Sequence, residues 1–156
     1  MSLDLKKVIV DTNVLLSAAI YPQSPSAQAL MTAFAFCTIY RSQETLHEIS
    51  TVLNRSKFDR YFGDTEFTRT MFLEAYIDKS IEAQITQIST DCADPKDNMF
   101  LSLALSTDAD IIVSGDIKHL LSMHPYARTD TFAGIDILSP KAFAEHLQGL
   151  QRLQDF

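Results

Sequence analysis

The sequence is poor in the residues that mark several protein classes. It has no tryptophan, four glycines and five prolines in 156 residues, and we find no low-complexity tract, internal repeat or interdomain linker. Its two cysteines, Cys37 and Cys92, form no CxxC pair and have no zinc-like spacing, so we expect two reduced thiols in a cytoplasmic protein. Residues 1–7 include an acid and no long apolar segment, so no signal peptide is expected.

Long apolar runs and positive charge are also lacking. The most apolar stretch, residues 27–40, is too short and too broken by polar residues to span a bilayer, so no membrane partner is expected. Thirteen basic residues stand against twenty acidic ones, which gives a formal net charge of −7. The whole molecule should therefore not attract nucleic acid, and any polyanion would have to bind a local basic patch or a bound cation.

The length and the 46% content of hydrophobic residues predict one domain over residues 1–156. A chain of this size buries about 70% of its unfolded surface, enough for a real core. Strand-like and helix-like segments alternate, which favours an α/β fold with a parallel sheet and helices on both faces. The expected strands are 7–10, 37–40, 81–88, 109–114 and 135–138. The expected helices begin near residues 13, 26, 42, 65 and 94, and a C-terminal helix begins near 140.

Two of the expected strands end in an acid. The apolar residues 8–10 are followed directly by Asp11, and residues 109–114 lead through Gly115 to Asp116. Buried parallel strands present such residues at the carboxyl edge of a sheet, where ligands of open α/β folds bind. Neighbouring strands lie about 4.8 Å apart, so we expect the carboxylates of Asp11 and Asp116 to share one hard cation.

Two helix acids complete a candidate metal site. Glu48 lies on the helix after the second strand, and Glu44, one turn earlier, is expected to lie further from the carboxyl edge of the sheet. Asp97 opens the helix before the strand that leads to Asp116, and Asp94 shares its first turn. Four carboxylates in one cleft repel each other unless a cation neutralises them.

The donor set indicates which cation and which chemistry. Oxygen ligands suit Mg²⁺ or Mn²⁺, and the lack of a His or Cys cluster argues against zinc. An ion held by carboxylates keeps positions open for water and a phosphate, so the implied reaction is metal-assisted hydrolysis of a phosphodiester.

Each of these residues also has a structural interpretation. Taken singly, Asp11 or Asp116 could be a helix N-cap. Asp97 could interact with the helix dipole, and Glu48 could be a solvated helix residue. Three small polar residues could cap helices or turns, or could orient water or phosphate: Thr12, Asn13 and Ser114. The inference depends on the whole set.

In this order the motifs resemble those of the PIN domain, and they are closest to bacterial PIN proteins of toxin–antitoxin pairs. The motifs are Asp11-Thr12-Asn13-Val14-Leu15, Glu44-Thr45-Leu46-His47-Glu48, Asp94-Pro95-Lys96-Asp97-Asn98 and Ser114-Gly115-Asp116. The resemblance implies a three-layer α/β/α domain with a central parallel sheet of four or five strands. It also implies Mg²⁺- or Mn²⁺-dependent ribonuclease activity, with an acidic quartet at Asp11, Glu48, Asp97 and Asp116. The family usually has threonine at the position of Ser114, and the role of Asp94 stays open.

The expected function is therefore hydrolysis of single-stranded RNA, by the toxin of a pair whose partner is an antitoxin protein. A catalytically inert interaction module on a PIN scaffold is the alternative. A phosphatase of the haloacid-dehalogenase type would need a second acid at the position of Asn13. A C-terminal apolar stripe could pack on its own domain or support a homodimer or partner contact: Phe143, Leu147, Leu150 and Leu153.

A basic and aromatic segment, residues 55–61, follows the helix of Glu48. It could hold RNA phosphates and stack a base on Phe58 or Tyr61, or it could be a solvated helix end with its aromatic rings in the core. With one residue that follows the second strand, its basic side chains are the candidate RNA contacts: Arg41, Arg55, Lys57 and Arg60.

Overall fold

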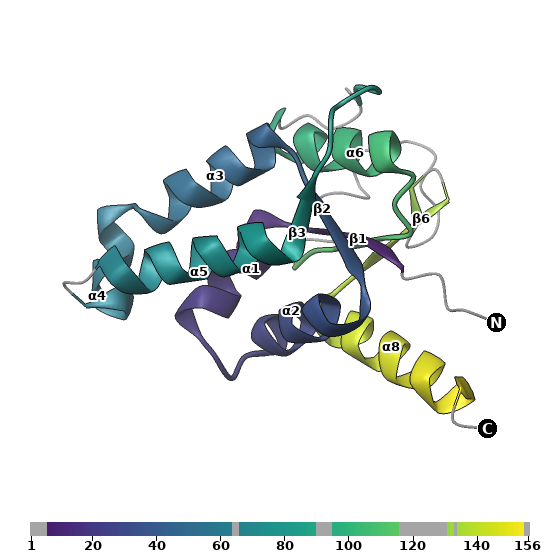
Figure 1. Cartoon of the computed structure of the whole chain (residues 1–156), viewed down its shortest axis with the longest axis horizontal. Helices are drawn as coiled ribbons and strands as arrows, with labels where there is room; N and C mark the ends of the chain where they lie inside the picture. The colour runs from purple at the N-terminus through teal and green to yellow at the C-terminus, as the bar shows by residue number, and fades with distance from the viewer. Residues whose placement is uncertain (1–5, 64–65, 90–94, 116–130, 133, 155–156) are drawn as a thin grey trace.

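The computed structural model describes residues 6–63, 66–89, 95–115, 131–132 and 134–154 of the chain. Its centre is a six-stranded sheet in the order β3-β2-β1-β4-β6-β5 (Figure 1). The strands are β1 (Lys7–Val10), β2 (Thr38–Arg41), β3 (Ser80–Glu82), β4 (Ile111–Val113), β5 (Thr131–Phe132) and β6 (Ile135–Leu138). Five of them are parallel, as expected, whereas β5 is a short antiparallel edge strand that the sequence did not indicate.

Helices follow the strands along the chain. They are α1 (Thr12–Ile20), α2 (Pro25–Phe36), α3 (Gln43–Leu53), α4 (Asp59–Phe62), α5 (Glu66–Lys79), α6 (Pro95–Thr107) and α8 (Pro140–Gln154), with a 3-10 turn, η1, at Ser56–Phe58. Local caps explain where several begin. Ser42 and Thr45 form a reciprocal capping box at the start of α3, and the Ser24 hydroxyl accepts the N–H of Ala27 in the first turn of α2. Among the described residues, no helix is long and apolar enough to cross a membrane.

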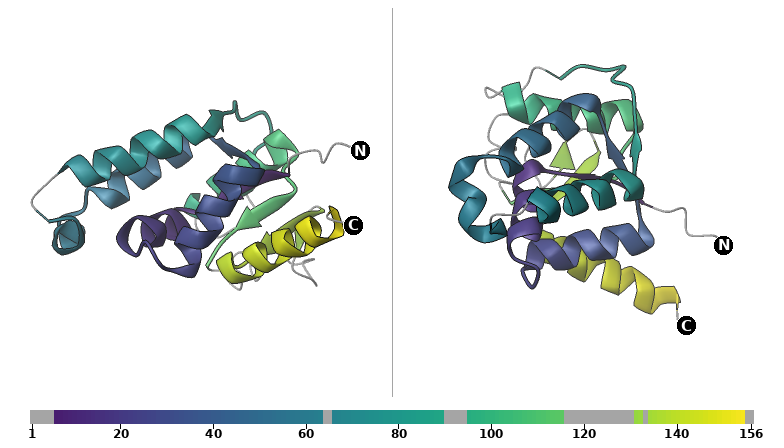
Figure 2. Two further views of the ribbon diagram at one scale, coloured as in Figure 1. Left: turned by 60° about the horizontal axis from the view of Figure 1, so that its bottom comes forward. Right: turned by 60° about the vertical axis from the view of Figure 1, so that its left-hand side comes forward.

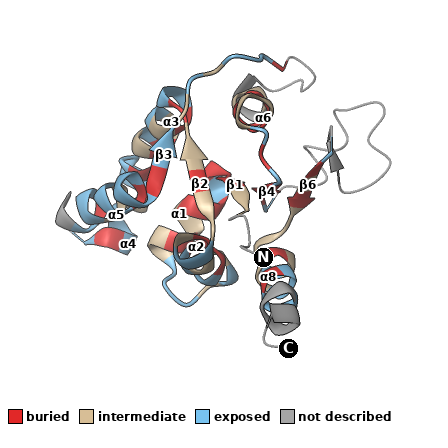
Figure 3. Ribbon diagram, turned by 45° about the vertical axis from the view of Figure 1, so that its right-hand side comes forward, coloured by how far each residue is buried: buried red, intermediate tan, exposed pale blue. Residues whose placement is uncertain are grey.

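The central strands of the sheet, β1 and β4, are buried between two helical layers, whereas β3 at its edge is partly exposed (Figure 3). Because side chains alternate along a strand, Val8 and Val10 join the core beneath α1, α2 and α8, whereas Ile9 faces α6 on the other side. Phe143 and Leu147 of α8 are buried in the first of these cores. This part of the C-terminal stripe therefore packs on its own domain, and the three-layer α/β/α architecture is confirmed.

The third strand is shorter than the sequence predicted. It was expected over 81–88, but β3 ends at Glu82, and the chain then leaves the sheet and runs along α6. The Ser106 hydroxyl accepts the N–H groups of Thr86 and Gln87, both at 3.0 Å, and the Ser102 hydroxyl accepts the N–H of Ser89 at 2.8 Å. Serine side chains of a helix thus replace the partners that a further strand would have supplied.

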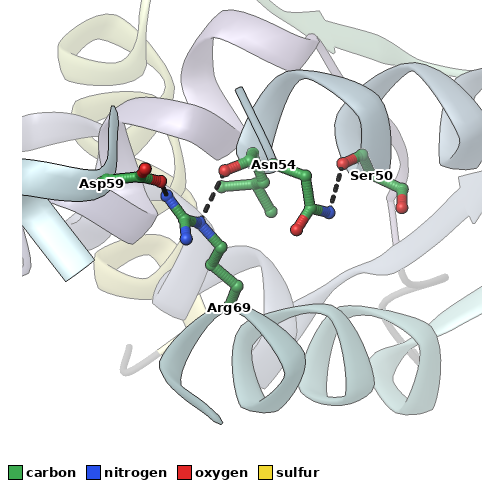
Figure 4. Close-up of polar contacts among 5 residues, drawn as sticks. Ser50, Asn54, Asp59 and Arg69 are labelled. Carbon is green, nitrogen blue, oxygen red and sulfur yellow. Dashed lines mark hydrogen bonds and ion pairs between the residues drawn. The ribbon is translucent and has the colours of Figure 1, made fainter. Parts of the chain in front are cut away.

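A buried arginine holds the arm formed by α3, α4 and α5, in which α3 and α5 run side by side (Figure 2). Arg69 of α5 is only 7% exposed, and its Nε donates to the carbonyl of Leu53 at the end of α3 at 2.7 Å (Figure 4). Its Nη2 donates to Asp59 at 2.6 Å, and the guanidinium lies 4.7 Å from the ring centroid of Phe62. One side chain therefore caps α3 and ties together three helices.

Candidate active site

Asp11 connects the central strand to the first helix. Its N–H donates to the carbonyl of Val113 at 3.0 Å, so it still belongs to the ladder between β1 and β4. Its carbonyl accepts the N–H groups of Val14 and Leu15 of α1, both at 3.1 Å. Its Oδ1 accepts the N–H of Asn13 at 3.1 Å, which makes Asp11 the N-cap of α1. The carboxylate therefore lies at the carboxyl end of β1, held by the helix that it caps.

Ser114 is the partner of Asp11 from the neighbouring strand. Its hydroxyl donates to Oδ2 of Asp11 at 2.6 Å, a length typical of a charge-assisted O–H···O⁻ bond. Ser114 is fully buried and Asp11 is 8% exposed, so the bond is shielded from bulk water. The N–H of Ser114 donates to the carbonyl of Leu138 in β6 at 2.9 Å. Two neighbouring parallel strands therefore bring the side chains that directly follow them into contact at the carboxyl edge of the sheet.

The remaining acids are described to different extents. Glu48 lies half-buried on α3, and Asp97 lies in the first turn of α6, although its side chain is outside the described set. Asp116 and Asp94 lie outside the described residues, so the predicted approach of Asp116 to Asp11 stays a prediction. Within the part of the chain that the structure describes, no three His, Cys, Asp or Glu residues gather closely enough to hold a metal ion.

The topology places the start of α6 at the carboxyl edge of the sheet. The other end of this helix lies at the opposite edge, where the Lys7 ammonium at the start of β1 contacts the carbonyl of Thr107 at 3.4 Å. The thirteen residues of α6 span about 20 Å, so its first turn lies at the far side of the sheet from Thr107, near the carboxyl ends of the strands. The backbone of Asp97 is therefore on the same side of the molecule as Asp11.

The expected position of Glu44 was wrong. Because α3 begins at Gln43, directly after β2 ends at Arg41, Glu44 lies in the first turn and is closer along the helix to the end of β2 than Glu48. It is exposed and lines a hollow of about 290 Å³ between α3 and α6. The other lining residues are Ile85, Ile88, Met99 and Ser102. This hollow leaves open space next to the elements that carry Glu48 and Asp97.

The candidate RNA contacts fall into two groups. Arg41 bridges β2 and β3, because its Nη1 donates to the carbonyl and the hydroxyl of Ser80 at 3.0 and 3.2 Å. Arg55, Lys57 and Arg60 are exposed at the outer end of the arm. Their contact with RNA stays a prediction, and Arg41 has a structural role in any case.

Tyr21, which no motif of the sequence indicates, follows α1 and contacts Tyr61 of α4 with the ring centroids 5.8 Å apart. No sequence signal could have found this pair, because forty residues separate its members. Phe58 is only half-buried and Tyr61 is exposed, so the aromatic rings of residues 55–61 are not fully buried in the core.

Comparison with known proteins identifies the fold family. The family model of the PIN domain matches residues 7–118, which include β1, β4 and the Asp11–Ser114 pair. The chain belongs to the PIN domain family. PIN domains are generally metal-dependent nucleases.

Similar proteins match this PIN domain over most of its length. The uncharacterized protein MJ1680 of Methanocaldococcus jannaschii is 30% identical over 146 residues, which cover 91% of this chain and 92% of that protein. A crystal structure of VapBC2 from Rickettsia felis, bound to a DNA fragment from their promoter, superposes with a TM-score of 0.58 at 15% identity. The match covers 85% of this chain and 98% of that one.

PAE2754 from Pyrobaculum aerophilum superposes with a TM-score of 0.56 at 14% identity, and the match covers 92% of this chain and 90% of that one. At such low identities the structural likeness establishes the fold.

The described residues of the PIN domain fit a hard divalent cation. The Asp11 carboxylate and the buried hydroxyls of Thr12 and Ser114 offer oxygen atoms, the donor type that such ions prefer. Thr12 is 6% exposed, and its buried hydroxyl has no hydrogen-bond partner within the described part of the chain. An unsatisfied buried hydroxyl next to an anchored carboxylate is typical of a site whose polar groups serve a ligand or an ordered water.

Proposed function

We propose that this PIN domain is a metal-dependent endoribonuclease that hydrolyses phosphodiester bonds of single-stranded RNA. The single observation that carries the proposal is the anchoring of Asp11. Two neighbouring strands and the start of α1 hold its carboxylate at the carboxyl edge of the sheet, with hydrogen bonds of 2.6 and 3.1 Å. A carboxylate that is needed only as a helix cap would not require a second, buried hydroxyl from another strand.

Asp11, Glu48, Asp97 and Asp116 would hold Mg²⁺ or Mn²⁺ in this proposal. The ion, when bound, would make hydroxide available near neutral pH and stabilise the charge on the leaving oxygen. The chain's own residues prepare the site, because Ser114 fixes one oxygen of Asp11 and the N–H of Asn13 fixes the other. Thr12 and the side chains of Asn13 and Asp94 are the proposed supporting groups.

We further propose that the protein acts in the cytoplasm as the toxin of a toxin–antitoxin pair. The motifs resemble those of bacterial toxins, and the VapBC2 proteins share the fold. An antitoxin protein would then be the natural partner, and a homodimer is a second assembly to test. The proposed contacts for RNA phosphates are Arg41 and three exposed basic residues at the outer end of the arm: Arg55, Lys57 and Arg60.

A cleavage assay with a matched pair of variants tests the proposal. Fluorescent single-stranded RNA of mixed sequence is incubated with the protein and Mn²⁺, with EDTA as the control. We expect the parent to cleave, Glu48→Gln and Asp116→Asn to be inactive, and Glu44→Gln to stay active. Glu44 and Glu48 lie one turn apart on the same helix, so the pair separates metal ligation from local charge.

The outcomes distinguish the assignments. If Glu44→Gln is inactive while Glu48→Gln cleaves, the ligand assignment is wrong and the nuclease proposal stands. Millimolar Mn²⁺ should also raise the melting temperature of the parent, because an ion that binds only the folded state stabilises it. If the parent shows neither this increase nor cleavage of any RNA, the inert interaction module is the better explanation.

A further inference from the structure

Aromatic side chains from two distant segments meet on the surface of the arm. We call Tyr21, Lys57, Phe58, Arg60 and Tyr61 the Tyr61 patch. The rings of Tyr21 and Tyr61 meet edge to face, and those of Phe58 and Tyr61 are 6.4 Å apart. Tyr21 is 51% exposed and Tyr61 is 38% exposed, so much of this aromatic surface faces solvent.

Two cations lie on these rings. The guanidinium of Arg60 is 4.7 Å from the ring centroid of Tyr61, and the ammonium of Lys57 is 5.1 Å from that of Phe58. Arg60 also donates a hydrogen bond of 2.7 Å to the Tyr61 hydroxyl. These contacts hold long, flexible side chains against one face of the Phe58 and Tyr61 rings. A base would therefore stack on the guanidinium plane of Arg60 or on a ring face that the cations leave free.

The patch is a local exception to the charge of the molecule. The chain carries −7, but residues 55–61 contain three basic side chains and one acid. That acid, Asp59, forms an ion pair of 2.6 Å with the buried Arg69. The charge of Asp59 is therefore compensated by Arg69, and the five residues of the patch carry two positive charges and no acid.

Flat rings combined with positive charge suit one class of ligand. Single-stranded nucleic acids bind by stacking bases on aromatic side chains while basic groups follow the backbone. An acidic polypeptide would use the charges but would gain little from exposed ring faces. A duplex would keep its bases inside the stack and out of contact with Tyr21 and Tyr61.

The position of the patch relates it to the candidate active site. Helix α1 begins at its cap, Asp11, and ends at Ile20, just before Tyr21. Its nine residues rise by about 14 Å, so the patch lies roughly that far along the helix from Asp11. Helix α3, which carries Glu48, packs against α1 and ends before η1. The two helices thus lead from the proposed cleavage site to the patch.

We propose that the Tyr61 patch is a base-stacking subsite for single-stranded RNA, a few nucleotides away from the phosphodiester that is cleaved. The subsite contacts the flat faces of the bases and the phosphates, which all sequences share, so it should bind strands of any sequence. As a part of substrate binding it depends on the proposed function, but its affinity for RNA can be measured without cleavage.

The test is the binding of a fluorescein-labelled oligouridylate in EDTA, followed by anisotropy. Tyr21→Leu and Tyr61→Leu remove the ring faces but keep apolar side chains, and we expect the double variant to bind about tenfold more weakly or worse. The variant with Lys57→Gln and Arg60→Gln should lower the slope of log K against log salt by about 1.4, or 0.7 per lost phosphate contact.

Matched controls lie elsewhere on the surface. Phe36→Leu changes a 49% exposed aromatic residue at the end of α2, and Lys141→Gln removes an exposed charge near the start of α8. Both controls should bind the oligonucleotide like the parent. Melting curves verify folding, and Tyr21→Leu alone serves as the ring variant if the double variant does not fold.

Three results would overturn the proposal. They are equal binding by the ring variants and the parent, no binding of the oligonucleotide by the parent, and binding of polyglutamate as tight as that of RNA and insensitive to loss of the rings. The last would identify a site for acidic polypeptides. Because EDTA prevents metal-dependent cleavage throughout, absence of nuclease activity in the earlier assay would not alter any of these readings.

Discussion

Replacing Asp11 by asparagine and by alanine separates its chemical role from its structural one. Asparagine caps helices about as well as aspartate, so its Oδ1 can still accept the N–H of Asn13. Its amide group can donate to the Ser114 oxygen, which reverses the direction of the bond seen at 2.6 Å. Without metal, the loss of one charge should also reduce repulsion within the proposed acidic cluster. We expect Asp11→Asn to lie within about 1 kcal/mol of the parent or to be more stable.

Alanine removes the two hydrogen bonds that the carboxylate forms with Asn13 and Ser114. Loss of an N-cap costs about 1 kcal/mol, and loss of a hydrogen bond to a charged group costs about 1.5–3 kcal/mol. Because Asp11 is only 8% exposed, water cannot fully replace these partners. The expected loss for Asp11→Ala is about 2–4 kcal/mol, which for a chain of this length lowers the melting temperature by roughly 5–15 °C.

Thermal melts in EDTA measure the stability of the two variants, and RNA cleavage in Mn²⁺ measures their activity. Both variants should be inactive, but only Asp11→Ala should be clearly destabilised. If Asp11→Asn melts as early as Asp11→Ala, the charge of Asp11 is chiefly structural. If Asp11→Asn cleaves RNA like the parent, Asp11 is not a metal ligand and the proposed site is wrong.

Three further predictions concern single side chains. Ser114→Ala should lose about 1.5–3 kcal/mol of stability and much of the metal-dependent cleavage, whereas Ser114→Thr should keep both; equal activity of the two would refute the orienting role. Arg69→Met should lower stability by about 2–4 kcal/mol in urea unfolding, because the buried carbonyl of Leu53 loses its donor, and an unchanged midpoint would contradict this. Burial, with a smaller effect from the charge of Asp110, raises the pKa of the Cys37 thiol to about 11. In a Cys92→Ser background, alkylation of Cys37 near pH 8 should therefore be about a hundredfold slower than that of a free thiol, and its rate should increase with pH. A rate like that of a free thiol would refute the raised pKa.

The order of strands and helices could be predicted from the sequence because it depends on local patterns. The β-branched run before Asp11 forms β1, and Ser42 and Gln43 mark the start of α3 where they were expected to. Segment ends were less predictable. β3 ends early because Ser102 and Ser106, on a later helix, bind the chain that leaves the sheet. Such partners are invisible in a local pattern.

The sequence by itself determined which residues follow the buried strands, and with them the edge at which Asp11 lies and the chemistry that carboxylates favour. Only the tertiary structure decided which side chains meet there. The contact of Ser114 with Asp11 spans 103 residues, and that of Tyr21 with Tyr61 spans forty. The first contact depends on β4 pairing beside β1, and the second depends on α1 packing against α3. Which strands pair and which helices pack together depend on the apolar surface buried across the whole core, and a short stretch of sequence does not determine that total.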